Sequence, residues 1–404
     1  MRPTRTSISW NYQPRGTAVR KSFSHLTAFS LKPRYNLLPF PSCYAFCMYT
    51  RIFLALLLAA AVPGFAQTAD NPTPGLPQDP TGVFTVVAIT NDYSALKPGH
   101  LKATYQLYDD AGKPTDQGTY EYWWASKQVY RSTWTRGSAT YTVWHTADGK
   151  VAYQGSSEAL NYFEYRLEAA LRLPLTSAGE VDPAKFRLDP HGFTASAGSV
   201  VTCFNTVPIT SEEDKVQTFT VGSFHTSLFH TYCINTRVGL LLGIYSFGTQ
   251  VVKFSNFKQI EGRYLAREVY FREDARNILS AKVDTIDTLS PTDPALTPPQ
   301  EAKPVTIDRV QLGADIAEGL LVKRVAPAYP QDAKDSHIQG KVVFQAIIGI
   351  DGRVRDLQLL SASSASLANS AFWSVSQSQY KPYVRNGKPV EVETTVDVTY
   401  LPGQ

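Results

Sequence analysis

A proline-rich break divides the second half of the chain. Residues 289–305 read LSPTDPALTPPQEAKPV and hold five prolines in seventeen positions. Proline fixes φ and has no N–H to donate, so a segment this rich in proline continues neither a helix nor a sheet. We therefore expect a linker at 289–305, with a larger domain at 81–288 and a smaller domain at 306–404.

An apolar run near the N-terminus has the form of a secretory signal peptide. Arg51 follows Met48 and supplies a positive charge, residues 52–62 are continuously apolar, and Gly64 and Ala66 are small residues at the exit. We predict a signal peptide over 48–66 with cleavage after Ala66, which makes the mature protein periplasmic. The apolar run is shorter than the roughly 20 residues that span a bilayer. The alternative is an uncleaved anchor that attaches the protein to the inner membrane.

Charge is distributed unevenly between this leader and the remainder. Residues 1–66 contain eight Lys or Arg and no Asp or Glu, which leaves 31 basic and 35 acidic residues in 67–404. The mature protein is then mildly acidic, so nucleic acid is not an expected partner. Because signal peptides begin near the initiator, we expect translation to start at Met48. On this interpretation residues 1–47 are a mis-assigned extension, and 67–80 form a polar, flexible lead-in.

Two of the four cysteines remain after removal of the leader. Cys203 and Cys233 lie thirty residues apart, and we predict that they form a disulfide in an exported protein. Two free buried thiols are the alternative. His225 and His230 stand five apart, a spacing that suits a metal pair on neither a strand nor a helix. No metal or cofactor is therefore expected.

Alternating apolar residues and turn signals predict a mainly-β domain over 81–288. One helix, at 157–172, carries an apolar stripe at helical spacing. We expect a curved sheet or half-barrel closed by one or two helices. The expected strands are 101–108, 118–124, 129–135, 140–145, 199–206, 216–222, 228–235, 239–247, 251–260, 262–273 and 279–287.

The pattern of residues 306–404 predicts a small α+β domain. Together with the mainly-β larger domain and its helices, this places the whole chain in the α+β class. Helices are expected at 330–336 and 364–379, and strands at 340–349, 354–360 and 391–400. The last strand alternates apolar and polar residues, which is typical of a sheet with one buried and one wet face. The pattern predicts a three-stranded antiparallel sheet with two helices.

Five features in this block resemble the TonB C-terminal domain over roughly residues 320–402. Tyr329-Pro330 precedes an Ala-containing helix, a Gly340-led strand follows, and Asp351-Gly352 forms a hairpin turn. Tyr380 and Pro382 follow the second helix, and 387–390 (GKPV) lead into the last strand. Ala326 and Ala328 stand where better-studied members of the family carry glutamines.

The resemblance implies docking of a peptide strand. TonB proteins bind the short TonB box of outer-membrane transporters by strand addition, in which an extended peptide hydrogen-bonds along a sheet edge. The expected partner is an outer-membrane TonB-dependent transporter or another envelope protein. The expected contact residues are Val392, Thr394, Val396 and Val398 on the edge strand, with Ala326, Ala328, Tyr329 and Pro330 before the first helix.

The larger block is similar to the LolA/LolB half-barrels, which are periplasmic carriers. The similarity lies in GTYEYWWASKQVYRSTW and in the ending FKQIEGRYLAREVYFREDARNILSAKVDTI. It implies a concave pocket for a lipid or a hydrophobic peptide. Trp123, Trp124, Trp134 and Trp144 would line such a pocket or, as the alternative, fill an ordinary core.

Signatures of catalysis are missing from the sequence. The chain has no G-x-S-x-G, G-x-G-x-x-G, P-loop or H-E-x-x-H motif. We expect a binding protein rather than an enzyme. A carrier whose C-terminal domain serves as a docking module is the alternative to a TonB-like interaction protein.

Overall fold

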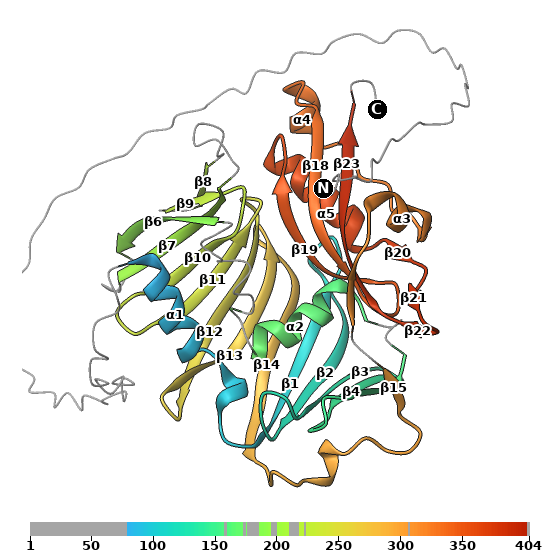
Figure 1. Cartoon of the computed structure of the whole chain (residues 1–404). Helices are drawn as coiled ribbons and strands as arrows, with labels where there is room; N and C mark the ends of the chain where they lie inside the picture. Colours follow the sequence, from blue (N-terminus) through green and yellow to red (C-terminus); the bar gives the residue numbers. More distant parts are fainter. Residues whose placement is uncertain are drawn as a thin grey trace, which may run out of the picture. The chain divides into compact units, whose positions relative to one another are not determined.

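The computed structural model describes most of the chain from residue 79 onward (Figure 1). The described ranges are 79–156, 160–172, 175, 186–194, 200–209, 218–221, 224–305 and 308–401. All of them belong to one compact unit. The expected extension at 1–47 and signal peptide at 48–66 lie outside these ranges. Within the ranges, no helix has both the length and the apolar character needed to cross a membrane.

Thirteen strands form one antiparallel sheet in the order β15-β5-β4-β3-β2-β1-β14-β13-β12-β11-β10-β7-β6. Figure 1 shows this sheet as open and curved, which confirms the mainly-β prediction for the larger block. The strands are β1 (Gly99–Tyr108), β2 (Pro114–Trp124), β3 (Tyr130–Arg136), β4 (Ala139–His145), β5 (Val151–Gly155), β6 (Phe186–Thr194), β7 (Val200–Pro208), β10 (Thr231–Asn235), β11 (Leu240–Ser246), β12 (Gln250–Ile260), β13 (Arg263–Glu273), β14 (Arg276–Thr288) and β15 (Lys303–Val305). A separate hairpin joins β8 (Thr218–Val221) to β9 (Phe224–Ser227).

Helix α1 (Pro80–Thr90) packs on this sheet, although its β-branched sequence PTGVFTVVAIT disfavours a helix. Two features of its start compensate. Asp79 accepts a hydrogen bond from the N–H of Gly82 at 2.7 Å, and Pro80 occupies the first turn. Phe84 then packs edge-on against Phe204 of β7. Burial of this apolar face therefore outweighs the weak local propensity. A 3₁₀ turn, η1 (Tyr93–Ala95), follows the helix.

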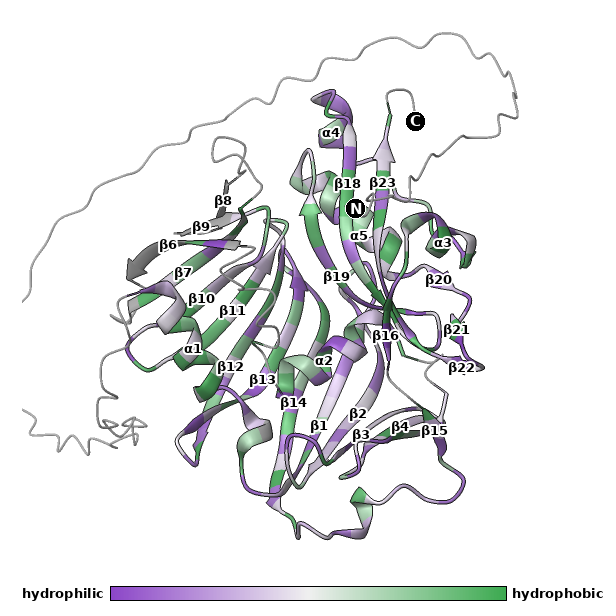
Figure 2. Cartoon of the chain, viewed as in Figure 1, coloured by the Kyte–Doolittle hydropathy of each residue, from purple (hydrophilic) through white to green (hydrophobic). Residues whose placement is uncertain are grey.

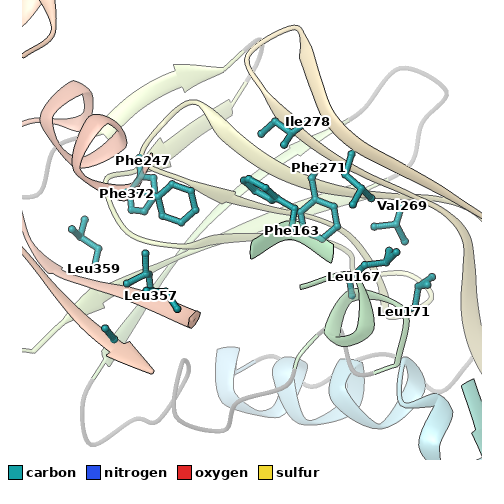
Figure 3. Packing of buried hydrophobic residues seen from close by; sticks show 14 of the residues in the cluster. Phe163, Leu167, Leu171, Phe247, Val269, Phe271, Ile278, Leu357, Leu359 and Phe372 are labelled. Atoms are coloured by element: carbon teal, nitrogen blue, oxygen red, sulfur yellow. The ribbon is translucent and has the colours of Figure 1, made fainter. Parts of the chain in front are cut away.

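Helix α2 (Tyr162–Arg172) confirms the helix predicted in this region, and its start is fixed by a capping box. Asn161 accepts from the N–H of Glu164 at 2.9 Å, while the Glu164 carboxylate accepts from the N–H of Asn161 at 2.7 Å. Phe163 and Leu167 point into the core that Figure 3 shows, toward Phe271 of β13. The helix therefore covers the same face of the sheet as the strand residues of that core.

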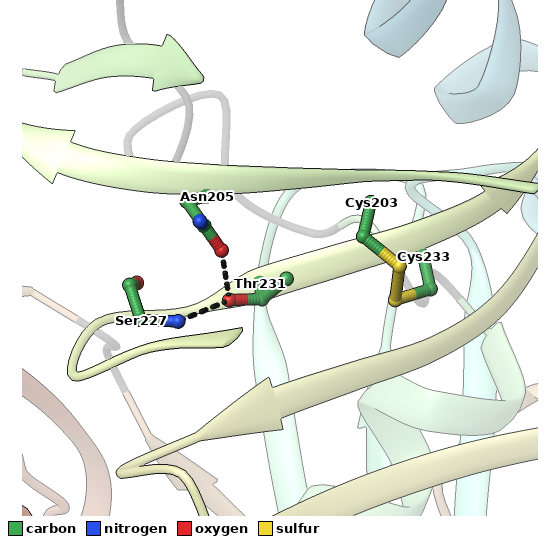
Figure 4. The surroundings of a disulfide bond; sticks show 5 residues. All are labelled: Cys203, Asn205, Ser227, Thr231 and Cys233. Carbon is green, nitrogen blue, oxygen red and sulfur yellow. Dashed lines mark hydrogen bonds between the residues drawn. A yellow bond between two sulfur atoms is a disulfide. The ribbon is translucent and has the colours of Figure 1, made fainter. Parts of the chain in front are cut away.

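The disulfide lies on the opposite face of the sheet. Cys203 of β7 and Cys233 of β10 are directly paired in the ladder, with Cα atoms 4.0 Å apart, and their sulfurs are bonded (Figure 4). Their neighbours Phe204 and Tyr232 face α1 instead, because successive side chains alternate between faces. Beside the bond, Thr231 donates to Asn205 at 2.6 Å. The predicted disulfide is confirmed.

The proline-rich segment 289–305 lies along the large sheet. A short 3₁₀ turn, η4 (Pro294–Leu296), buries Leu296, and the carbonyl of Ala295 accepts from the indole N–H of Trp144 at 3.0 Å. Strand β15 then pairs antiparallel with β5. β15 is only three residues long and contains Pro304, which is tolerated because it lies at a sheet edge.

The C-terminal block corrects the prediction of a three-stranded sheet. Its sheet has four strands in the order β16-β23-β18-β19, because β16 (Arg309–Gln311) adds in parallel to β23. The other strands are β18 (Gly340–Ile348), β19 (Val354–Ser361) and β23 (Glu391–Tyr400). Small pairings join β17 (Leu321–Lys323) to β20 (Gln379–Tyr380) and β21 (Val384–Arg385) to β22 (Lys388–Pro389).

Three helices accompany this sheet in the described ranges, one more than expected: α3 (Ala314–Gly319), α4 (Gln331–Asp335) and α5 (Ala365–Ser376). Ser364 caps the start of helix α5, and its hydroxyl accepts from the N–H of Leu367. The core of this sheet is mostly aliphatic and also contains Phe344, Phe372 and Tyr400, and alternating hydrophobic and hydrophilic positions are visible along β18 and β23 (Figure 2).

Aromatic contacts join α5 to the helix-covered face of the large sheet. Phe372 of α5 packs against Phe247 at 5.5 Å and edge-on against Tyr162 of α2 at 5.2 Å, measured between ring centroids. Figure 3 shows Phe247, Phe372 and Phe163 within one apolar cluster. The indole N–H of Trp373 donates to Glu273 at 2.9 Å. Residues of both sheets therefore contribute to a continuous core.

Candidate docking edge and aromatic cavity

Strand β23 has β18 on one side and only a short partner on the other. β18 pairs with it over its whole length, from Gly340 opposite Tyr400 to Ile348 opposite Val392. β16 covers only Glu391–Glu393, in parallel. From residue 394 to residue 400, no strand in the described ranges pairs with this side of β23. Helix α3, which follows β16, also contacts the strand.

Hydrogen bonds at the two ends of β16 show which backbone groups of β23 point toward this edge. The N–H of Glu391 donates to the carbonyl of Asp308 at 2.9 Å, and the N–H of Leu312 donates to the carbonyl of Glu393 at 3.0 Å. Backbone groups alternate in direction along a strand. The N–H and C=O groups of Thr395 and Thr399 therefore face this same edge.

The four strand residues expected to contact a partner point their side chains into the core. Val392 and Thr394 are 2% and 4% exposed, and Val396 and Val398 are fully buried. Their side chains pack the domain, and their backbone groups face β18. An added strand would meet the backbone of the odd-numbered residues between them, a distinction that the sequence pattern alone did not make.

The other predicted contact segment lies along α5. Ala326, Ala328 and Pro330 line a groove of about 650 Å³ together with α5 and the turn at 247–249. The hydroxyl of Ser370 on α5 donates to the carbonyl of Ala328, which holds the extended segment against the helix. The structure brings these three residues together in one groove.

Tyr329 has a structural role that separates it from its neighbours. Its hydroxyl donates to the carbonyl of Ile338 at 2.7 Å, and its ring packs against Tyr400 at 5.4 Å. This tyrosine fixes the segment to the end of β23, so it links the two predicted contact regions.

The second edge of the small sheet is covered by α2. Arg166 of α2 donates to Asp356 of β19 at 2.8 Å, with both side chains partly exposed. The guanidinium of Arg355 lies 3.3 Å above the centre of the Tyr165 ring of α2, within cation–π range. Among the residues that the structure describes, the β23 side is therefore the edge better placed to accept a further strand.

A cavity of about 310 Å³ lies between α2 and strands β3, β4 and β5. Six of its eighteen lining residues carry aromatic rings, and residues of the C-terminal block close one side. The lining includes Tyr130, Trp134, Tyr141, Tyr153, Tyr165, His145, Glu168, Arg172, Val305, Gly349, Arg355 and Glu391. Its volume falls at the lower end of the range typical of small-molecule sites.

Of the four tryptophans singled out in the sequence, only Trp134 lines this cavity, and its indole N–H donates to the carbonyl of Glu164 at 3.0 Å. Trp124 fills the core beside Tyr122. On the other face, Trp123 and Trp144 flank the guanidinium of Arg131. Trp134 therefore lines a pocket and Trp124 fills the core, whereas Trp123 and Trp144 pack around Arg131 on the opposite face.

Charged groups are built into the cavity wall. Arg172 donates to Glu168 at 2.9 Å and lies 4.1 Å above the Tyr130 ring. Burial and the nearby Arg172 lower the pKa of His145 to about 4, so its ring is neutral at pH 7. Burial also lowers the pKa of Arg355 to about 10, a value at which it remains charged. Arg172 and Arg355 each pair with a carboxylate, Glu168 and Asp351 respectively, so the charges in this wall already have partners within the chain.

Sequence reasoning missed β16 and the polar members of the cavity. β16 is three residues long and directly follows a proline-rich segment, so it has too few positions to show a period. Arg172 and Glu168 stand four residues apart on a helix that was predicted. That spacing is a usable signal, because residues at i and i+4 share a helix face.

Solved structures with similar folds cover about half of this chain. A DUF1329 family protein from Desulfovibrio piger is 10% identical over 54% of this chain and 96% of its own, with a TM-score of 0.34. An outer-membrane lipoprotein-sorting protein domain from Vibrio parahaemolyticus is 9% identical over 55% and 94%, with a TM-score of 0.33. A LolA superfamily protein from Nitrosomonas europaea is 8% identical over 54% and 95%, with a TM-score of 0.28. LolA-type proteins thus occur among the structures similar to this chain.

Family comparison gives a sharper result for the C-terminal block. None of the curated proteins matches the chain. Residues 325–401, which include α4, α5, β18, β19 and β23, match the family described as the C-terminal of the Gram-negative bacterial TonB protein, so the resemblance expected for this block is confirmed.

Proposed function

We propose that this chain is a periplasmic interaction protein whose C-terminal domain docks an extended segment of an envelope partner on the β23 edge. The partner is an outer-membrane TonB-dependent transporter or another envelope protein. The observation that carries this proposal is the parallel addition of Arg309–Gln311 to Glu391–Glu393, because this edge already binds one strand. The TonB match over 325–401 supports the same class of partner.

Recognition on this edge is mainly by main chain. The backbone groups of the even-numbered residues of β23 face β18, so a partner strand would bond to the outward N–H and C=O groups of the odd-numbered residues. Affinity in the micromolar range, about −8 kcal/mol, is typical of such short interfaces. The protein acts by binding, and we propose no catalytic step.

Two neighbouring proline substitutions test the docking edge. Thr395→Pro removes an N–H that faces outward, which proline tolerates at an edge. Val396→Pro removes an N–H that faces β18, so it serves as the control for damage to the sheet. We expect Thr395→Pro to retain the unfolding midpoint and to lose at least tenfold in affinity for synthetic TonB-box peptides from transporters of the same organism, measured by calorimetry.

The same pair of variants can contradict the proposal. A folded Thr395→Pro chain that binds these peptides as tightly as the unmodified chain would exclude docking along this part of β23. Val396→Pro should lower stability by about 1–3 kcal/mol through the lost ladder bond. Failure of every transporter peptide to bind the unmodified chain would remove this class of partner.

The cavity favours a second candidate function, in which the large sheet carries a ligand and the C-terminal domain is its docking module. The lipid or hydrophobic peptide expected from the LolA likeness would occupy the 310 Å³ space beside α2. Mass spectrometry of solvent extracts from natively purified chain tests this. Ala169→Phe fills part of the cavity and should remove the bound ligand, while Thr395→Pro should retain it.

A further inference from the structure

The strand that closes the docking edge is held weakly. β16 has three residues; Arg309 and Gln311 are exposed, and only Val310 is partly buried. Its pairing with β23 is parallel, which is slightly less stable per residue than antiparallel pairing. Few buried contacts and solvent-exposed backbone bonds are the features of segments that open locally.

Specific contacts nevertheless set its register. The Arg309 guanidinium donates to Glu391 at 3.1 Å, and Val310 lies opposite Val392. The Thr394 hydroxyl donates to the carbonyl of Leu312 at 3.1 Å. Val310 and Leu312 both pack against the core of the small sheet. The segment Asp308–Leu312 is therefore fixed at one position along β23, with a cation at its start and aliphatic residues two positions apart.

We propose that β16 holds the place of the partner's docking strand and that its sequence is a template for that strand. This rests on the proposed function and names the chemistry of the partner. The partner segment runs parallel to β23, places a basic residue opposite Glu391, and has aliphatic residues at the positions of Val310 and Leu312. It displaces β16 together with the short helix α3 that follows.

Covalent connection explains why a partner must compete. β16 is joined through residues 306 and 307 to β15, which is paired with β5 of the large sheet. A tethered strand acts at a high effective concentration, in the millimolar range for short linkers. Apparent affinity for a free strand is reduced by the fraction of chains whose edge is open. Weakening β16 should therefore raise the affinity for any strand that fits this edge.

The test uses the full chain and a synthetic peptide of residues 306–313, TIDRVQLG. Asp308 and Leu312, two residues on either side of Val310, both bond to β23. Because backbone groups two residues apart point to the same side of a strand, the N–H of Val310 also faces β23, and Val310→Pro removes it. Gln311→Pro removes an N–H that faces away and is the matched control. We expect the peptide to bind Val310→Pro at least tenfold more tightly than it binds the unmodified chain or Gln311→Pro.

Charge reversal tests the template itself. Glu391→Lys, introduced into the Val310→Pro chain, should weaken the peptide severalfold, and a peptide with Arg309→Glu should recover the loss. Equal binding of both peptides to both chains would show that the partner strand does not need a basic residue opposite Glu391. A folded Val310→Pro chain that binds the peptide no better than the unmodified chain would overturn the proposal that β16 occupies the position of the partner strand.

Hydrogen exchange in the unmodified chain keeps the proposal testable if Val310→Pro does not fold. The amide of Glu391, which bonds to β16, should exchange at least tenfold faster than the amide of Val392, which faces β18. Equal protection would show that β16 is a permanent strand and would overturn the proposal.

Transporter peptides separate this inference from the proposed function. If they bind the unmodified and Val310→Pro chains equally, the result supports docking on the β23 edge and contradicts the proposal that β16 occupies the position of the partner strand. If the 306–313 peptide binds Val310→Pro and no transporter peptide competes with it, the template stands and the proposed class of partner fails.

Discussion

The two sheets of this protein present different chemistry. On the small sheet, β18 and β23 bury their apolar side chains against α5, and the edge offers backbone groups. The large sheet places rings, guanidinium groups and carboxylates around a cavity beside α2. The first arrangement suits a strand held mainly by its main chain, with one charge and two aliphatic positions setting the register, whereas the second suits a ligand held through side-chain chemistry.

The two regions should also differ in how strongly substitutions change the free energy of unfolding. Buried charges such as Glu164 are held only because partners surround them, and on the small sheet Asp397 is the corresponding case, because Lys341 pairs with it at 2.9 Å. The other outward-facing positions of β23 are partly exposed and bury no charge. Substitutions beside the cavity should therefore be costly, and substitutions at the docking edge should be cheap. Each prediction below tests one part of this contrast.

The largest effect is expected at Glu164, which is fully buried on α2. Its carboxylate accepts from Tyr105 at 2.6 Å and pairs with Arg136 at 3.0 Å. Glu164→Ala leaves the guanidinium of Arg136, whose side chain is 22% exposed, and the buried hydroxyl of Tyr105 without this partner. We expect a loss of about 3–5 kcal/mol in the free energy of unfolding, measured by urea denaturation.

The same arginine supplies the control for this measurement. Asp116 also pairs with Arg136, at 3.0 Å, but 65% of its side chain is exposed. Asp116→Asn should cost no more than about 1 kcal/mol, because solvent screens exposed pairs. Equal losses from Glu164→Ala and Asp116→Asn would show that burial does not determine the cost here.

Removal of the disulfide should have the next largest effect. Cys203 and Cys233 close a loop of 30 residues on the face opposite α1. Loop entropy predicts a loss of about 3–4 kcal/mol for the double substitution of both cysteines by serine. Unmodified chain under reducing conditions should unfold at the same urea concentration as this variant. Two different midpoints would mean that the serines themselves disturb the sheet.

A pH-dependent loss of stability is expected from His145 in the cavity wall. Its pKa is lowered to about 4 by burial and by Arg172, whereas an unfolded histidine titrates near pH 6.5. Between these values the unfolded chain binds the extra proton, so stability falls as the pH drops from about 6.5 to 4. The shift corresponds to about 3 kcal/mol over that window.

His145→Phe isolates this contribution because it removes the titrating group and keeps a ring beside Tyr130, which His145 stacks on at 4.1 Å. We expect the difference in unfolding free energy between the two chains to change by about 3 kcal/mol between pH 7 and pH 4. A difference that is independent of pH would show that His145 is not held neutral by its surroundings.

The sequence predicted the elements with a long, clear period. Residues 391–400 alternate apolar and polar positions, and β23 spans these residues. Helix α5 begins one residue later than expected, after Ser364, and ends at Ser376, where its C-terminal turn closes before the predicted end at 379. Long patterns survive because many side chains share the same burial requirement.

Elements that depend on distant partners escaped prediction. α1 has a strand-like sequence and forms a helix because Phe84 and Val87 bury against the sheet. β6 contains Pro190 and Gly192, both of which disfavour a strand. β16 exists only where β23 supplies bonds, so no local signal marks it. The fourth strand, and with it the nature of the docking edge, is a tertiary property.

The smallest effect on stability is expected at Arg309. A substitution there tests whether β16 is held by a charged side chain or by backbone hydrogen bonds. Its pair with Glu391 is 46% exposed on the arginine side. Arg309→Ala should lower stability by less than about 1 kcal/mol and should leave the hydrogen exchange of the Glu391 amide nearly unchanged. Backbone bonds from Asp308 and Leu312 would still hold β16 in register. If Arg309→Ala instead released β16 as completely as Val310→Pro, the docking edge would depend on a charged side chain, and its chemistry would be that of the cavity wall rather than that of a main-chain ladder.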